Sequence, residues 1–222
     1  MKRFLRRVLI LLLIGVLGLF GYGWLGYRDA VQGGAEFAAR ADALMADGRA
    51  GVNLGLDRRD MLLAVEDPAF EAHVGIDLTT PGGGITTITQ SLSKRLGFEV
   101  FRPGIAKIRQ SGYALGLERQ LTKPQILALF LETASMGRGP DGTWIIGFFA
   151  ASEAHFDDAP SEIPEDDFLS LVAVLIAPGD LSLAEPGPEL QERVSRIKRL
   201  LSGECQPIDN GDVWLEACGT GP

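Results

Sequence analysis

Histidine and cysteine are scarce in this chain, since each occurs only twice among its 222 residues. Two cysteines exclude a zinc module built on cysteine pairs, and two histidines argue against a histidine-rich metal site. Basic residues are also few in the body: four of the 21 Lys and Arg lie in residues 1–27, so residues 28–222 hold 17 against 29 Asp and Glu. A body this acidic lacks the basic surface that nucleic-acid binding requires, which excludes general nucleic-acid binding.

Alternating apolar and polar residues, the pattern of a half-buried strand, are almost missing, with one weak case near 98–101. An apolar fraction of 46% and a charged fraction of 23% exclude a wholly disordered or low-complexity chain. Apolar residues instead recur at helical spacing, which predicts helices over 56–65, 86–96, 104–120, from 123 onward, 144–156, 164–177 and 188–201. The body is therefore predicted to be mostly α, with loops at 76–84 and 137–142.

A single long apolar run lies near the N-terminus, from Val8 to Tyr27, and contains no charged residue. As a helix it would span about 30 Å, enough to cross the hydrocarbon core of a membrane. Four cations, Lys2, Arg3, Arg6 and Arg7, precede the run, and aromatic residues gather at its distal end. A cleaved signal peptide is the alternative, but its apolar region is usually about 7–15 residues and ends at a small-x-small site. We expect an uncleaved anchor with the N-terminus in the cytoplasm and the body outside it.

The organisation that follows has five parts: a basic tail (1–7), a transmembrane signal-anchor (8–27), a connector (28–50), the main domain (51–202) and a C-terminal tail (203–222). The tail contains Cys205 and Cys218, separated by a stretch with turn-forming residues. In an exported compartment such a pair can oxidise, so we expect a disulfide, which would contribute about 3 kcal/mol. Two free thiols are the alternative.

Polar residues suited to chemistry are densest in 66–94. Glu66-Asp67 follows an apolar helix at once, and a carboxylate there can have a raised pKa and serve as a base if it faces a cleft. The segment from Gly84 to Lys94 holds three Thr, a Gln and two Ser, whose hydroxyl and amide groups suit a sugar or a phosphate. Each feature alone also fits a plainer structural interpretation, a solvated helix end for the first and helix capping for the second.

Taken together and in order, the two segments resemble the glycosyltransferase family 51 domain, the peptidoglycan polymerase module of penicillin-binding proteins and monofunctional transglycosylases. The family's first motif, Glu-Asp-x-x-Phe-x-x-His-x-Gly, is met by Glu66, Asp67, Phe70, His73 and Gly75. Its second motif, Gly-x-Ser-Thr-x-Thr-Gln-Gln-x-x-Lys, is met in part by Gly84, Thr86, Thr87, Thr89, Gln90, Ser91 and Lys94, with Thr86 for Ser and Ser91 for the second Gln. The resemblance extends over roughly residues 50–201.

This resemblance implies a lysozyme-like helical fold and polymerisation of lipid II into glycan strands at the cytoplasmic (inner) membrane, with the body in the periplasm. It implies that Glu66 is the general base, that Lys94, Lys107 and Arg109 hold the donor pyrophosphate, and that Thr86, Thr87 and Gln90 line the donor side. It also carries over Asp67, His73 and Gln110 as substrate-binding residues. The implied partners are lipid II, the growing glycan chain, the membrane and cell-wall synthesis proteins.

The chain also departs from the family. Gln110 stands where the family's third motif has the second active-site carboxylate. An amide holds no negative charge, so Gln110 weakens the support for the divalent cation, Mg²⁺ or Mn²⁺, that the resemblance implies. Glu132 and Phe149 replace a family Asn and Glu. The short stretch of 76–83 stands where the family has a longer flap, which predicts a reduced small lobe. Two alternatives therefore stay open: a catalytically impaired scaffold protein of a wall-synthesis complex, and a lysozyme-like hydrolase, which normally needs two carboxylates.

Overall fold

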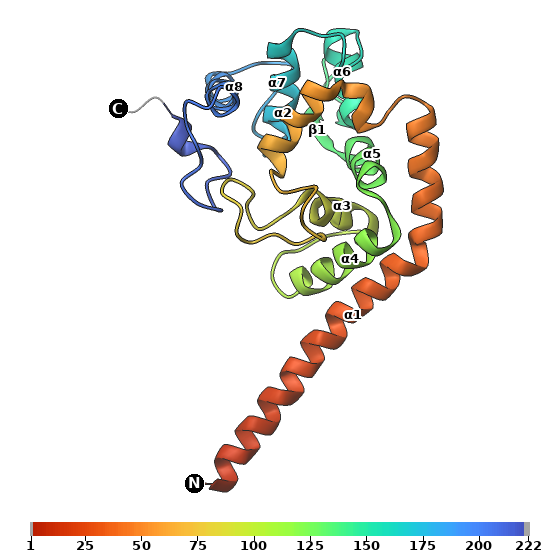
Figure 1. Cartoon of the computed structure of the whole chain (residues 1–222), viewed down its shortest axis with the longest axis vertical. Coiled ribbons are helices and arrows are strands. Elements are labelled where there is room, and N and C mark those ends of the chain that lie inside the picture. The colour runs from red at the N-terminus through yellow and green to blue at the C-terminus, as the bar shows by residue number, and fades with distance from the viewer. Residues whose placement is uncertain (1, 220–222) are drawn as a thin grey trace.

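The computed structural model describes residues 2–219, in which a long N-terminal helix, α1 (Lys2–Ala46), projects from a rounded helical body (Figure 1). The other elements are a 3₁₀ turn (Gly51–Leu54), α2 (Leu56–Glu66), α3 (Ile88–Gly97), α4 (Ala106–Gln120), α5 (Lys123–Thr133), β1 (Ser135–Arg138), β2 (Trp144–Ile146), α6 (Phe148–Phe156), α7 (Glu165–Val174), α8 (Pro188–Leu201) and a second 3₁₀ turn (Glu216–Cys218). The expectation of a mostly α chain with a reduced small lobe is confirmed.

Local sequence explains where α3 and α5 begin. Thr87 caps α3 by accepting the backbone N–H of Gln90, and the Gln90 side chain accepts the backbone N–H of Thr87 in return. Thr122 and Gln125 form the same reciprocal pair at the start of α5. Such capping boxes satisfy amide groups that have no partner within the helix, so both starts are encoded locally.

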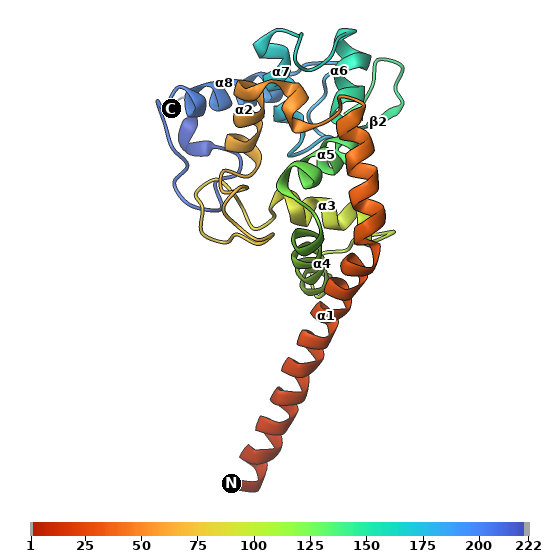
Figure 2. The same ribbon diagram turned by 45° about the vertical axis from the view of Figure 1, so that its right-hand side comes forward.

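The hydrophobic core is centred on α5 and α7. In α7, Phe168, Leu169, Leu171, Val172, Ala173 and Val174 are all fully buried. A helix that is apolar on nearly all sides is stable only when other elements cover it, and α7 is such an inner helix. In Figure 2, α5 lies between α3 and the end of the body that carries α6 and α7.

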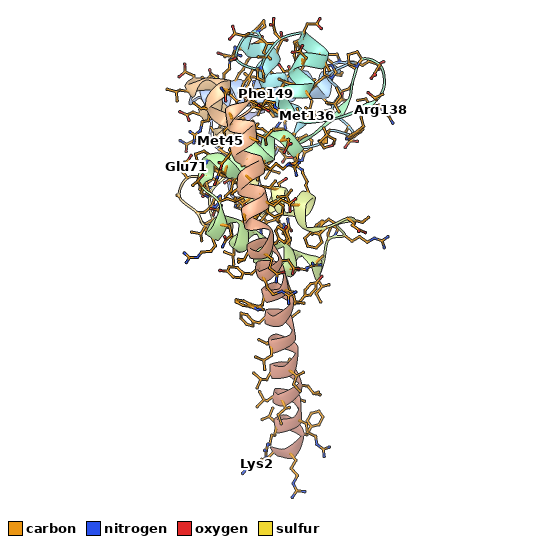
Figure 3. All side chains as sticks on the ribbon, turned by 90° about the vertical axis from the view of Figure 1, so that its right-hand side faces the viewer. Lys2, Met45, Glu71, Met136, Arg138 and Phe149 are labelled. Atoms are coloured by element: carbon orange, nitrogen blue, oxygen red, sulfur yellow. A yellow bond between two sulfur atoms is a disulfide. The ribbon has the colours of Figure 1, made fainter. Side chains whose placement is uncertain are left out.

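The apolar part of α1 extends away from the body, and Lys2 lies at its far end (Figure 3). This helix is long and apolar enough to cross a membrane, judged by length and composition. Its side chains between Phe4 and Phe20 are largely exposed, an arrangement that is unfavourable in water and suits a lipid environment.

Most of the expected connector over 28–50 is helical, because α1 continues as one helix to Ala46, through Gly33-Gly34. The second half of α1 packs along α4 and α5, and Ala30, Ala41 and Leu44 are buried there. Tertiary packing thus extends a helix whose own sequence is polar and punctuated by glycine.

Glycines bring α1 and α4 into close contact. A Cβ atom on Gly112 would lie 1.9 Å from the carbonyl oxygen of Gly23, and one on Gly26 would lie 2.1 Å from the carbonyl oxygen of Arg109. A Cβ on Gly116 would lie 2.6 Å from the carbonyl oxygen of Tyr27. The two backbones touch over two turns of helix, so the anchor helix and α4 form one rigid unit.

A small hairpin replaces the first part of the helix expected over 144–156. Strands β1 and β2 pair antiparallel with an irregularity between Ser135 and Gly137, and α6 begins only at Phe148. A Cβ on Gly137, whose φ is 84°, would lie 2.6 Å from the carbonyl oxygen of Pro178, so the hairpin packs tightly on the body. The weak strand pattern near 98–101 forms no strand.

The glycine contact between α1 and α4 predicts that Gly112→Val destabilises the protein. The new side chain would collide with the Gly23 backbone, and overpacking of this kind costs about 1–3 kcal/mol. Thermal unfolding of the full chain in detergent measures the loss as a lower Tm. Gly179→Ala is the matched control, because a Cβ there has no atom within 4 Å. An unchanged Tm for Gly112→Val would refute the close packing.

Candidate active site

Asp67 connects the two sequence motifs. Its carboxylate is almost fully buried and lies 2.9 Å from Nε2 of His73, and it accepts the backbone N–H of Ile88 at 2.8 Å. The other ring nitrogen of His73, Nδ1, accepts the backbone N–H of Gly75 at 3.0 Å. The proton of the neutral ring therefore sits on Nε2, which donates to Asp67.

Further hydrogen bonds hold the loop that follows α2 against the starts of α3 and α5. The Thr87 hydroxyl donates to the carbonyl of Gly75 at 2.8 Å. The Lys123 ammonium donates to the carbonyl of His73 and to Glu118, each at 2.8 Å. These contacts fix the end of α2 against the start of α3, and Glu66, next to Asp67, is held in place with them.

A cavity of about 320 Å³ opens beside Glu66, between the end of α2, the glycine loop (residues 82–84), α3 and α8. Thr86 and Thr87 of the second motif are among its lining residues. The full lining consists of Val65, Glu66, Gly82, Gly83, Gly84, Ile85, Thr86, Thr87, Ile88, Ser91, Lys94, Phe130, Leu175, Ile176, Arg193 and Val213. Within the described residues 2–219, Glu66 is the one acidic residue of this lining.

Burial in this cavity raises the pKa of Glu66 from its usual value of 4.5 to about 7. The neighbouring charge of Asp67 adds to this rise, whereas the cations Arg193 and Arg95 favour the ionised form and oppose it. A carboxyl group with a pKa near neutrality exchanges a proton readily at physiological pH, which is the property of a general acid or base.

Two lysines lie on the α3 and α4 side of the cavity. Lys94 lines the cavity, and its pKa is lowered by burial first and then by the nearby charges of Lys107 and Arg95. Lys107 donates to the Thr86 hydroxyl at 2.7 Å, and burial lowers its pKa as well. Like charges held together in a partly buried site favour an anionic ligand.

Arg193 of α8 is a site residue that the sequence analysis missed. It lines the cavity with 3% of its surface exposed, and burial lowers its pKa to about 10. Within the described part of the chain its Nε and Nη1 atoms have no hydrogen-bond partner. A signal existed: Arg193 lies three residues after Leu190 and four before Ile197, on the apolar face of an amphipathic helix.

Several of the expected residues lie outside the cavity lining. Arg109 forms an ion pair with Asp29 of α1 at 2.8 Å and covers the Phe98 ring. Gln90 caps α3, and its Nε2 donates to Ser111 at 3.0 Å. Arg109 thus fastens α4 to the anchor helix in this structure.

Gln110 is likewise fully buried between α3 and α4, outside the cavity. Its Nε2 donates to the backbone carbonyl of Gln90 at 2.7 Å. Asp67 and His73 are also placed as buried supports of Glu66 and do not line the cavity. Of the expected substrate-binding residues, Thr86, Thr87 and Lys94 line the cavity, and Lys107 reaches it through Thr86.

The residues at the cavity do not fit a divalent cation. Mg²⁺ and Mn²⁺ prefer several oxygen ligands, of which carboxylates contribute most. Glu66 stands alone there and is surrounded by the cations Lys94, Arg95 and Arg193, while Gln110 is directed to a backbone carbonyl. No group of three or more His, Cys, Asp or Glu gathers among residues 2–219.

A disulfide joins Cys205 to Cys218 in the C-terminal tail, the pairing that we expected. The tail lies against α8, where Cys218 is buried and its carbonyl accepts a hydrogen bond from the Arg199 guanidinium. Val213 of the tail lines the cavity.

The fold and the cavity define a class: a helical domain on a membrane-length helix, with one carboxyl group whose pKa is about 7 and which lies near buried cations. Comparison with known proteins then identifies the family. The profile of the family described as Transglycosylase matches residues 54–202, so this chain belongs to the transglycosylase family. The resemblance found in the two motifs is thereby confirmed.

Curated relatives carry the name "Biosynthetic peptidoglycan transglycosylase". One from Marinomonas sp. (strain MWYL1) is 31% identical over 150 residues, which are 62% of this chain and 64% of the relative. One from Pseudomonas aeruginosa is 29% identical over 150 residues, 62% of each chain. One from Escherichia coli is 27% identical over 151 residues, 62% of this chain and 60% of the relative. The chain thus matches less than two thirds of the length of these relatives.

The buried position of Gln110 predicts that Gln110→Glu destabilises the protein more as the pH rises. A carboxylate there would face the Gln90 carbonyl, so its folded pKa would be raised and stability would be lost once the pH exceeds its unfolded value. We expect a loss of about 1–3 kcal/mol, the scale for an unsatisfied buried polar group. Chemical denaturation at pH 5 and pH 8 measures it.

Gln191→Glu is the matched control, because Gln191 is exposed in the first turn of α8 and the same change should cost nothing there. Equal stability of Gln110→Glu and wild type at pH 8 would contradict the placement of Gln110.

Proposed function

We propose that this protein is a membrane-anchored peptidoglycan glycosyltransferase that polymerises lipid II into glycan strands. The observation that carries the proposal is Glu66, a carboxyl group with a pKa of about 7 in a cavity that also holds Lys94 and Arg193. Membership of the transglycosylase family and the printed names of the relatives support it.

In the proposed reaction Glu66 removes the proton from the acceptor sugar hydroxyl as its oxygen attacks the anomeric carbon of the donor. The bond between that carbon and the lipid diphosphate breaks, and the diphosphate leaves with the bonding electrons. Lys94 and Arg193 stabilise the negative charge that develops on the diphosphate, with Lys107 behind Thr86. Positioning of the two large substrates contributes the rest of the rate enhancement.

The proposed location is the cytoplasmic membrane, with one crossing by α1 and the body on the outer, periplasmic side. The four cations before the apolar run support this orientation by the positive-inside rule. The glycine contacts between α1 and α4 would hold the cavity at a fixed height above the bilayer, where a lipid-linked substrate presents its sugars. Proteins of cell-wall synthesis are the partners proposed for such a body.

A second candidate function, a non-catalytic scaffold that binds the same ligands, is favoured by the lack of a second carboxylate in the cavity lining of residues 2–219. The hydrolase alternative receives no such support. Glu71, the next acidic residue after Asp67, is exposed at the surface of the body (Figure 3) and pairs with Arg59, so it supplies no second carboxylate to the cavity.

Glu66→Gln should abolish lipid II polymerisation, because the amide cannot accept the proton of the acceptor hydroxyl. Loss of a general base costs about 10²–10⁴-fold in rate. Gel analysis of the glycan products made by purified full-length protein measures the effect. Glu71→Gln is the matched control, since Glu71 is exposed and outside the cavity, and it should retain activity. Full polymerase activity in Glu66→Gln would reject Glu66 as the base.

The raised pKa of Glu66 also predicts the pH profile of this activity. A base works in its ionised form, so kcat/KM should rise with pH and level off above about 7, instead of above about 4.5. Initial rates between pH 5 and pH 9 test this. A wild-type protein that binds lipid II but makes no polymer at any of these pH values would favour the scaffold.

The proposed topology predicts that a reporter active only in the cytoplasm is silent when it is fused after Pro222. A reporter active only outside the cytoplasm should give full signal at the same position. Strong cytoplasmic signal from the first fusion would reverse the orientation.

A further inference from the structure

The C-terminal tail beyond α8 lies outside the region that matches the family, yet it is packed against the loop that borders the cavity. In Figures 1 and 2 the tail runs beside the loop that joins α2 to α3. This loop contains residues 76–83, the short stretch that stands where the family has a flap.

Four hydrogen bonds join the loop to two residues of the tail. The backbone N–H groups of Gly82 and Gly84 donate to the carbonyls of Asp209 and Asn210, at 2.9 and 2.8 Å. The Asn210 side chain contributes the other two hydrogen bonds, because its Nδ2 donates to the carbonyls of Thr80 and Gly84 at 3.0 and 2.8 Å. Asn210 thus binds the loop through both its backbone and its side chain.

The loop and the tail also fit closely in space. Gly82 and Gly84 have φ values of 75° and 65°, in the region that favours glycine. A Cβ on Gly82 would lie 2.7 Å from Pro207, and a Cβ on Gly84 would lie 2.7 Å from Val213. Glycine at both positions therefore allows the loop to approach the tail this closely, and Val213 lines the cavity beside it.

The tail is itself fastened at both ends of its turn. The Cys205–Cys218 disulfide closes it, its own Leu215 is buried, and Arg196 of α8 donates to the carbonyl of Trp214 at 3.3 Å. The Trp214 ring lies 5.8 Å from the guanidinium carbon of Arg193, the buried cation of the cavity. One closed segment thus touches both the glycine loop and a cationic residue of the site.

We propose that the disulfide-closed tail is a fixed wall of the substrate cavity, with Asn210 as a positioning residue that holds the glycine loop in its binding shape. The tail takes the place of a mobile flap and holds this side of the site in one conformation. The substrate class, a lipid-linked diphosphate sugar, rests on the proposed function. The positioning of the loop by the tail does not.

The first experiment tests the wall without requiring any activity. Hydrogen–deuterium exchange of the full-length protein in detergent is compared before and after a dithiol reductant opens Cys205–Cys218, the reductant becoming a disulfide. Peptides that contain Gly82 and Gly84 should exchange at least about 10-fold faster after reduction, because their amide protection depends on the tail. The Cys205→Ser/Cys218→Ser variant should show the fast exchange with and without reductant. Unchanged exchange of these peptides overturns the proposal, whether or not the protein is active.

The second experiment tests the consequence for the substrate. Asn210→Ala keeps the disulfide and should raise KM for lipid II more than it lowers kcat, with kcat/KM reduced about 10- to 100-fold, the scale for displaced positioning groups. Asn210→Asp, which cannot donate to the loop carbonyls, should behave like Asn210→Ala. Ile208→Ala, a change at an exposed tail residue, should behave like wild type.

The outcomes separate the two proposals. Faster exchange with unchanged lipid II kinetics overturns the wall and leaves the proposed function standing. If wild type makes no polymer, the proposed function fails, and affinity for lipid II tests the wall instead. Weaker binding by Asn210→Ala than by wild type then supports the wall. Equal binding by the two proteins, or no binding by wild type, overturns it.

Discussion

The carboxylate of Asp67 accepts hydrogen bonds from the His73 ring and from the first amide of α3, and the site depends on this contact. A buried carboxylate is costly unless its oxygens are satisfied, so the two donors must be in place for the chain to fold around it. His73 in turn is oriented by the Gly75 amide. Because Glu66 precedes Asp67 in the chain, the same constraint places the Glu66 carboxyl group in the cavity.

Charge then decides what this cavity can do. Burial holds the pKa of Glu66 near neutrality, although Arg193 and Arg95 pull it down, so neither effect alone would give a group that titrates at about 7. Arg193 and Lys94 give the lining an excess of positive charge, which suits a ligand that carries phosphate. The closed C-terminal tail contacts the short loop on one side of this small cavity, and on another side α4 contacts the lining through Lys107 and Thr86.

Most helices could be predicted from the sequence because apolar spacing and capping residues are local signals, as at Thr87 and Thr122. The hairpin was missed because strands as short as Trp144–Ile146 contain too few residues to show a period of two. The continuous course of α1 through Gly33-Gly34 was missed for a different reason. It depends on packing against α4 and α5, which contribute no signal to the sequence of α1 itself.

The sequence by itself determined the membrane-length helix, the mostly α body, the cysteine pair and the identity of Glu66 as the candidate base, since composition and short motifs carry these features. The tertiary structure alone decided which cations reach the cavity. Both Arg109 and Arg193 belong to the matched region, but Arg109 pairs with Asp29 of α1, whereas Arg193 lies on the buried face of α8 and lines the cavity. It also decided that the tail borders the site. Such choices depend on contacts between residues far apart in the chain, and spacing along the sequence does not encode them.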